Sequence, residues 1–126
     1  MPLITVTLRS PKTTEFKNAV FDAVHGALVE SGVPVEDLFQ RAIELDAVNF
    51  RFDARYPDAR QDRDENFVLI EILWSAGRSV KIKKKLLDSL MQRLSAQEIH
   101  PENVMVVFKE TTWENWSFAG GRLIHT

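Results

Sequence analysis

Several features that would point to particular classes of protein are absent from this sequence. It contains no cysteine, which excludes disulfides and thiolate chemistry and fits a reducing compartment, so a cytoplasmic location is expected. No apolar stretch reaches membrane-spanning length, and no His, Asp or Glu cluster has metal-ligand spacing, so neither a membrane role nor a metal site is expected. The net charge of −2 and the pI of about 5.9 argue against a nucleic-acid binder that works by bulk electrostatics.

An internal repeat organises the chain. The length of 126 residues predicts one domain covering residues 1–126. Residues 66 positions apart match without gaps through strand, helix and turn, as in Ile4 with Ile70, Val20 with Leu86, and Asp37 with Asn103. One register held through three kinds of element indicates a duplicated β-α-β unit, at about residues 2–45 and 66–111.

Each unit can be drawn from its apolar periodicity. The first helix is expected to start after Ser10-Pro11 and to stop at Gly32, and the second to run over residues 79–97. In the second helix four residues are expected to face inward: Ile82, Leu86, Leu90 and Leu94. Strands are expected in residues 3–8, near residue 70, and at 39–45 and 104–110, with each unit joining two parallel strands by a right-handed crossover. The fold class is therefore α+β, a four-stranded mixed sheet with two helices on one face, and oligomerisation is expected to cover the other face.

Two segments lie outside the repeat. Residues 53–65 are polar and are expected to form either a linker or an active-site loop, and equally suit a mobile surface loop. The tail contains aromatic residues, which is unusual for a disordered end, so it is expected to pack on this subunit or on a neighbour.

The first candidate for chemistry is Pro2. Initiator methionine is usually removed before a small residue, which would leave a free secondary amine at the head of the first strand. A free α-amino group titrates near pH ~7.7–8.0 and can act as a base or an acid in neutral water. The alternative is that Pro2 is only a proline at a strand start, where proline is structurally harmless.

The second candidate is the start of the second helix, Ala76-Gly77-Arg78-Ser79. A glycine turn, a cation and a hydroxyl at a helix N-terminus suit an anion, although Ser79 can also be a simple cap and Arg78 a solvated side chain. Antiparallel pairing of the two units would bring Pro2 toward Arg78. Asp37 lies between helix and strand, where it is either a turn residue or part of a site, and its repeat partner Asn103 favours the turn role.

Together these residues resemble the tautomerase superfamily. Ile72 to Ser79 is similar to the strand, Gly-Arg-Ser and helix opening of 4-oxalocrotonate tautomerase, and Asn115 to Gly121 to that family's aromatic and Gly-Gly closing segment. Residues 34–40 and Trp116-Ser117-Phe118 look closer to the malonate semialdehyde decarboxylase branch. The resemblance implies trimeric or hexameric assembly, with a homotrimer favoured by the duplication. It also implies Pro2 as the catalytic amine, Asp37 as the acid of that branch, Arg78 as the binder of a substrate carboxylate, and Trp116 in the pocket wall.

The favoured hypothesis is a cofactor-free tautomerase acting on a small enolisable 2-oxo acid, with Pro2 as general acid and base. That decarboxylase branch pairs two nearby arginines, whereas here Ser75 and Ala76 precede a lone Arg78. One alternative is a decarboxylase or hydratase of a small 3-oxo or unsaturated acid, in which Pro2 works protonated and Asp37 orients water or substrate. The other is a non-catalytic oligomeric binding protein.

Overall fold

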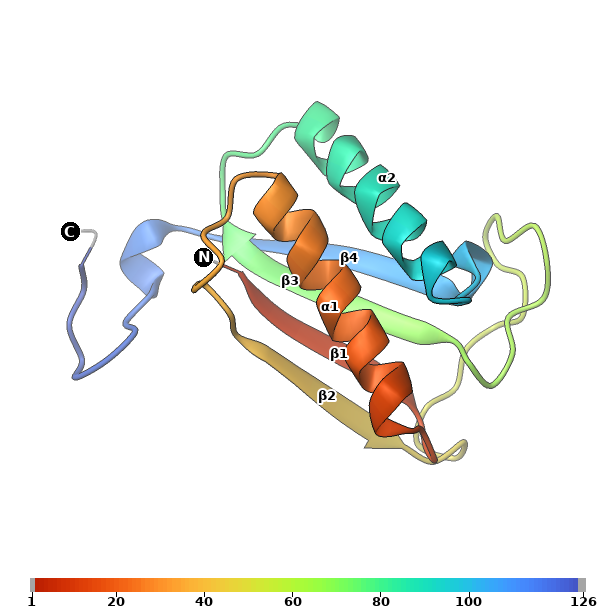
Figure 1. Cartoon of the computed structure of the whole chain (residues 1–126). Helices are drawn as coiled ribbons and strands as arrows, with labels where there is room; N and C mark the ends of the chain where they lie inside the picture. The colour runs from red at the N-terminus through yellow and green to blue at the C-terminus, as the bar shows by residue number, and fades with distance from the viewer. Residues whose placement is uncertain (1, 125–126) are drawn as a thin grey trace.

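Two β-α-β units share one sheet in the computed structural model, which describes residues 2–124 (Figure 1). In the first unit, α1 (Thr14–Glu30) connects two parallel strands, β1 (Leu3–Arg9) and β2 (Gln40–Leu45). In the second unit, α2 (Val80–Ala96) connects two parallel strands, β3 (Val68–Ser75) and β4 (Val104–Thr111). Short 3-10 helices precede and follow β4, namely η1 (Pro101–Asn103) and η2 (Trp113–Asn115). Met1, whose removal the sequence predicts, lies outside the described residues.

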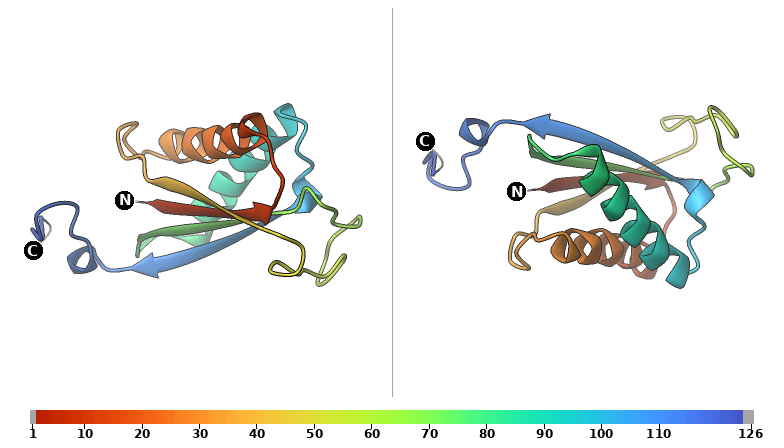
Figure 2. Two further views of the ribbon diagram at one scale, coloured as in Figure 1. Left: turned by 90° about the horizontal axis from the view of Figure 1, so that it is seen from below. Right: turned by 90° about the horizontal axis from the view of Figure 1, so that it is seen from above.

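The sheet has the order β2-β1-β3-β4, and its two central strands are antiparallel. Both helices cover the same face, as the two turned views show (Figure 2). This arrangement confirms the predicted α+β class and the parallel pairing within each unit. Neither helix within residues 2–124 is long and apolar enough to cross a bilayer.

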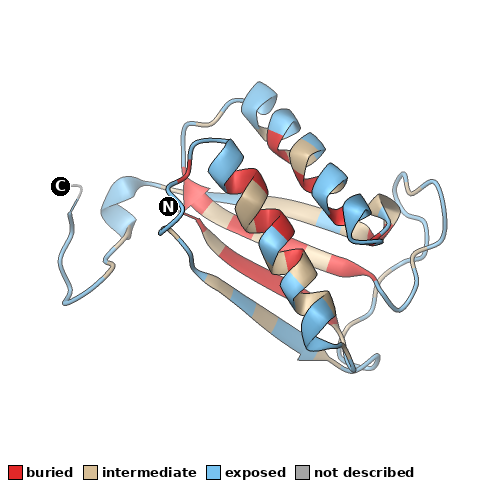
Figure 3. Cartoon of the chain, viewed as in Figure 1, coloured by how far each residue is buried: buried red, intermediate tan, exposed pale blue. Residues whose placement is uncertain are grey.

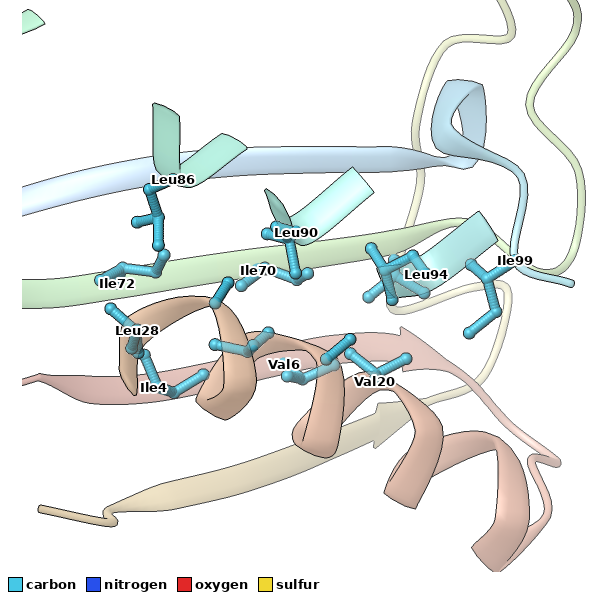
Figure 4. Packing of buried hydrophobic residues seen from close by; sticks show 14 of the residues in the cluster. Ile4, Val6, Val20, Leu28, Ile70, Ile72, Leu86, Leu90, Leu94 and Ile99 are labelled. Atoms are coloured by element: carbon cyan, nitrogen blue, oxygen red, sulfur yellow. The ribbon is translucent and has the colours of Figure 1, made fainter. Parts of the chain in front are cut away.

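The hydrophobic core lies between the helices and the sheet (Figure 3). Alternate residues of β1 and β3 point toward the helices, and Ile4, Ile70 and Ile72 are at most 1% exposed. They meet an apolar stripe on each helix, labelled in part in Figure 4, that includes Val20, Leu28, Leu86, Leu90 and Leu94. Removing these side chains from water supplies the main stabilisation of the fold.

The repeat extends to details that the apolar pattern does not contain. The Thr13 hydroxyl caps α1 by accepting from the Phe16 amide, and the Ser79 hydroxyl caps α2 by accepting from the Ile82 amide, 66 residues later. The same offset relates two ion pairs between helix and edge strand, Lys17 with Glu44 and Lys83 with Glu110. The first helix starts after Ser10-Pro11, as expected, and Thr13 is the side chain that caps it.

One helix position was predicted wrongly. Ile82 was expected to face inward, but it is 45% exposed, whereas Leu86, Leu90 and Leu94 are buried. Ile82 lies in the first turn of α2, beside the turn that follows α1, and it borders a surface cavity there. Its apolar character therefore contributes to a cavity wall and not to the core.

The second face of the sheet is only partly covered by its own side chains. Thr5 pairs in register with Glu71 on one side and Arg41 on the other, and the Arg41 Nε donates to the Thr5 hydroxyl at 3.0 Å. Lys109 forms an ion pair with Glu71 on the same face. Next to these charged residues Met105 is 47% exposed, so apolar and charged side chains alternate across an open surface.

Candidate active site

The antiparallel register of the central strands determines where Pro2 lies. Leu3 pairs with Leu73, so the start of β1 is beside the end of β3, and Pro2 is buried there. The Ile4 amide donates to the Phe39 carbonyl at 2.9 Å, which also brings the start of β2 to this end. We call this side of the sheet the Pro2 end; it combines the starts of β1 and β2 with the ends of β3 and β4 (Figure 1).

Arg78 is held firmly at the Pro2 end. Gly77 has a φ of +113°, a conformation that favours glycine, and it turns the chain from β3 into α2. The guanidinium of Arg78 lies 4.2 Å from the ring centroid of the buried Trp74, and its Nη1 donates to the Ser75 carbonyl at 2.5 Å. These contacts fix the plane of the cation, which stays partly exposed to solvent. Ser79, in contrast, is an N-cap, as one of the two sequence interpretations proposed.

Partial burial lowers the pKa of Arg78 from its ordinary value, and the negative charge of Glu110 opposes that effect. An arginine with a lowered pKa still carries its full charge at neutral pH, because its ordinary value is far above 7. Arg78 therefore offers a fixed, partly desolvated cation, which is the state in which a guanidinium binds a carboxylate most strongly.

Asp37 and Arg78 border the same cavity. Asp37 lies in the turn between α1 and β2, where its amide donates to the Pro34 carbonyl at 3.0 Å. The cavity, of about 360 Å³, forms where this turn meets the β3–α2 turn, and its lining also includes residues 31–34, Ile82 and Trp113. A carboxylate and a guanidinium that are far apart in sequence thus share one apolar-walled space. We call it the Arg78 cavity.

The aromatic tail folds back on the chain, as the sequence predicts. The rings of Trp116 and Phe118 stack with centroids 5.7 Å apart, and Phe118 lies 6.3 Å from Phe39 at the start of β2. Trp116 is partly buried and lies in this aromatic cluster, whereas the wall of the Arg78 cavity is formed by Trp113. Trp113 was not predicted as a site residue. Its position directly after the last strand, beside the end of β3, is the signal that would have identified it.

The repeat partners of the site residues lie at the opposite end of the sheet. Asn103 is buried, where its amide group exchanges two hydrogen bonds with Asp64 in the segment between the units. Lys12 donates to the Arg9 carbonyl at 2.8 Å, as Arg78 does to Ser75. The structure thus separates Lys12 and Asn103 from the Arg78 cavity, and the polar segment 53–65 also lies at this opposite end (Figure 1).

An aromatic cluster closes that opposite end. Phe50, Phe52 and Phe67 are in ring contact, and the Arg9 guanidinium lies 4.3 Å from the Phe52 centroid. Arg9 also donates to the Phe50 carbonyl at 3.0 Å. The segment between the units therefore packs against the end at which the second repeat would have its own cavity.

The chemistry available at the Pro2 end is that of a cation, a carboxylate and, if Met1 is removed, a secondary amine. A fixed cation can bind a carboxylate substrate and stabilise developing negative charge, and an amine with a pKa near neutrality can transfer a proton. Within residues 2–124 no three His, Asp or Glu side chains are grouped closely enough to hold a metal ion.

Comparisons with known proteins agree with this fold. A family model described as tautomerase enzyme matches residues 37–119. The fold is similar to the crystal structure of FG41 malonate semialdehyde decarboxylase inhibited by 3-bromopropiolate, with 27% identity and a TM-score of 0.87 over 96% of this chain and 92% of that one. It is equally similar to another malonate semialdehyde decarboxylase structure, with 26% identity and a TM-score of 0.87 over 96% and 93% of the two chains.

A fused 4-OT described as a symmetric trimer shares the fold at 23% identity, with a TM-score of 0.73 over 96% of this chain and 94% of that one. A search of curated protein sequences gave no match.

Proposed function

Because this chain belongs to the tautomerase enzyme family, we propose that it is a cofactor-free tautomerase that uses the amine of Pro2 to move a proton on a small enolisable 2-oxo acid. The observation that carries the proposal is the antiparallel register of β1 and β3, which gives Pro2 and Arg78 the same end of the sheet. In the proposed reaction, Arg78 holds the substrate carboxylate. The neutral amine removes the enol O–H proton, and the resulting ammonium returns a proton to C3, which gives the ketone.

The protonation state of Pro2 follows from its surroundings. Pro2 is buried and Arg78 is positively charged, and both conditions disfavour an ammonium ion. We therefore expect the pKa of the freed amine to lie below that of an ordinary α-amino group. At neutral pH the amine would then be ready to accept a proton.

The first experiment measures the intact mass of the purified protein and the ketonisation of phenylenolpyruvate before and after acylation of the N-terminus. We expect Met1 to be absent, and acylation or Pro2→Ala to abolish most of the activity. Retained Met1, or ketonisation that is indifferent to acylation, would contradict the role of Pro2. Retained Met1 with no ketonisation above the spontaneous rate would favour the alternative that the chain is a non-catalytic oligomeric binding protein.

A second candidate function is a decarboxylase or hydratase of a small 3-oxo or unsaturated acid. Two observations favour it: Asp37 borders the same cavity as Arg78, and two malonate semialdehyde decarboxylase structures are similar over nearly the whole chain. In that reaction Pro2 would act in its protonated form, and Asp37 would orient water or substrate. Turnover of malonate semialdehyde that is lost in Asp37→Asn, together with a normal or raised pKa of Pro2, would favour this reaction over tautomerisation.

We further propose that the chain forms a homotrimer in the cytoplasm. The open face of the sheet supports this assembly, because its exposed apolar residues lie among charged side chains, and a fused 4-OT of the same fold is described as a symmetric trimer. Light scattering should give about three times the 14.5 kDa chain mass. Replacing an exposed apolar residue of this face, as in Met105→Glu, should lower that mass, and an unchanged mass would count against this interface.

A further inference from the structure

A second cavity adjoins the Arg78 cavity. It lies between the C-terminal half of α1 and the N-terminal half of α2, two helix ends that both face the Pro2 end (Figure 1). The two cavities share Ser31 and Ile82 as lining residues, so they are neighbours at the end of α1 and the first turn of α2. We call the second cavity the interhelix groove.

The interhelix groove is mainly apolar. Its lining includes Ala27 and Leu86, which are buried, and Ile82, which is exposed. Its volume is about 210 Å³. Burying an alkyl chain in such a space is favourable, because it removes apolar surface of both partners from water.

The charged groups of the groove are of opposite sign. Lys85 and Glu30 both border it, and Glu30 accepts a hydrogen bond from Ser89. Glu30 lies on α1, across the groove from Lys85 on α2, and also forms an ion pair with Arg93 at 3.5 Å. Its negative charge opposes binding of a second carboxylate at Lys85. The cation that can bind a carboxylate is Arg78, in the adjoining cavity.

We propose that the substrate is a monocarboxylate with an apolar tail longer than three carbons, whose carboxylate binds Arg78 and whose tail passes Ile82 into the interhelix groove. This inference rests on the proposed function for the 2-oxo acid end of the substrate, and it adds that the opposite end is an apolar chain. Affinity should rise with tail length by about fourfold for each methylene buried, until the groove is full.

Binding tests the groove without any need for catalysis. Acetate, butanoate, hexanoate and octanoate are titrated into the full-length protein by calorimetry. We expect octanoate to bind at least tenfold more tightly than acetate. In Ser89→Phe the added ring occupies the groove, so the affinity difference between octanoate and acetate should disappear. Ser89→Ala loses the same hydrogen bond to Glu30 without adding volume, so this variant should keep the affinity difference.

Catalysis is then measured as exchange of the C3 hydrogens of pyruvate, 2-oxohexanoate and 2-oxooctanoate for deuterium. We expect kcat/KM to rise with chain length in the wild type and in Ser89→Ala, and to become nearly independent of length in Ser89→Phe. Equal affinities for acetate and octanoate, a length dependence unaffected by Ser89→Phe, or tighter binding of adipate than of octanoate would overturn the inference. If octanoate binds as expected but no 2-oxo acid exchanges, the proposed function fails and the groove assignment stands.

Discussion

Replacing Arg78 should separate binding of the substrate from stability of the fold, because the repeat supplies a matched control. Arg78 and Lys12 occupy equivalent positions in the two units, each donating to the carbonyl at the end of the preceding strand and each lying over an aromatic ring. Arg78 borders the cavity at the Pro2 end, whereas Lys12 lies at the opposite end. Arg78→Ala and Lys12→Ala therefore remove similar contacts from different ends of one sheet.

The expected magnitudes follow from those contacts. A hydrogen bond to a charged group contributes about 1.5–3 kcal/mol, so losing the carboxylate contact should lower kcat/KM by about 10- to 160-fold, mainly through KM. The free energy of unfolding should fall by about 1–2 kcal/mol in Arg78→Ala, because one hydrogen bond and one cation–π contact at 4.2 Å are lost. Lys12→Ala should cost about 1 kcal/mol or less, since its ring contact is longer, at 5.8 Å.

The assay is ketonisation of phenylenolpyruvate over a range of substrate concentrations, with urea unfolding of the same preparations. Lys12→Ala should keep the wild-type KM, and Arg78→Lys should fall between wild type and Arg78→Ala, because it keeps the charge but loses the planar fork. Equal KM values in Arg78→Ala and Lys12→Ala would refute the assignment of Arg78 to the carboxylate.

Three further outcomes are expected. Asn103→Ala should lower the free energy of unfolding by about 1–3 kcal/mol, because it removes the buried side-chain amide that forms two hydrogen bonds with Asp64. An unchanged urea midpoint would show that these bonds do not stabilise the fold. The hydrogen bond and charge of Lys83 lower the pKa of Glu110, so this pair stabilises the fold above pH 4.5 and loses its effect as the pH falls below it. The Tm of Lys83→Met should therefore lie below that of wild type at pH 7 and approach it in acid, and a constant difference would contradict the linkage. Trp113→Leu should raise KM several-fold with little change in Tm, because it removes part of the cavity wall, and an unchanged KM would exclude Trp113 from the binding site.

The architecture could be predicted from the sequence because its signals are local and repeated. Apolar spacing identified both helices, and one register over two units indicated parallel strands within each unit. Fold class and family were confirmed. Antiparallel pairing of the two units was expected to bring Pro2 toward Arg78, and the pairing of Leu3 with Leu73 agrees with that geometry.

What the sequence could not show depends on contacts between distant segments. The exposure of Ile82 depends on how the first turn of α2 packs against the turn after α1. The apolar periodicity of a helix carries no information about such a contact between two segments. Trp113 and Trp116 are three residues apart, and only the path of the chain after β4 shows that Trp113 borders the Arg78 cavity. Asp37 and Asn103 are equivalent positions of the repeat, and both were interpreted as turn residues. Asp37 borders the Arg78 cavity, whereas Asn103 forms hydrogen bonds with Asp64 in the segment between the units.

The continuity of the chain between the units makes their two ends chemically unequal. Val68 occupies in the second unit the position that Pro2 occupies in the first, but its nitrogen belongs to a peptide bond, where resonance removes the basicity that a terminal amine has. No exchange of side chains in the second unit can give Val68 a basic nitrogen, and the ring contact of Phe52 with Phe67, at 4.4 Å, lies at that end of the sheet. Removal of Met1 would therefore give the chain one terminal secondary amine for every two β-α-β units.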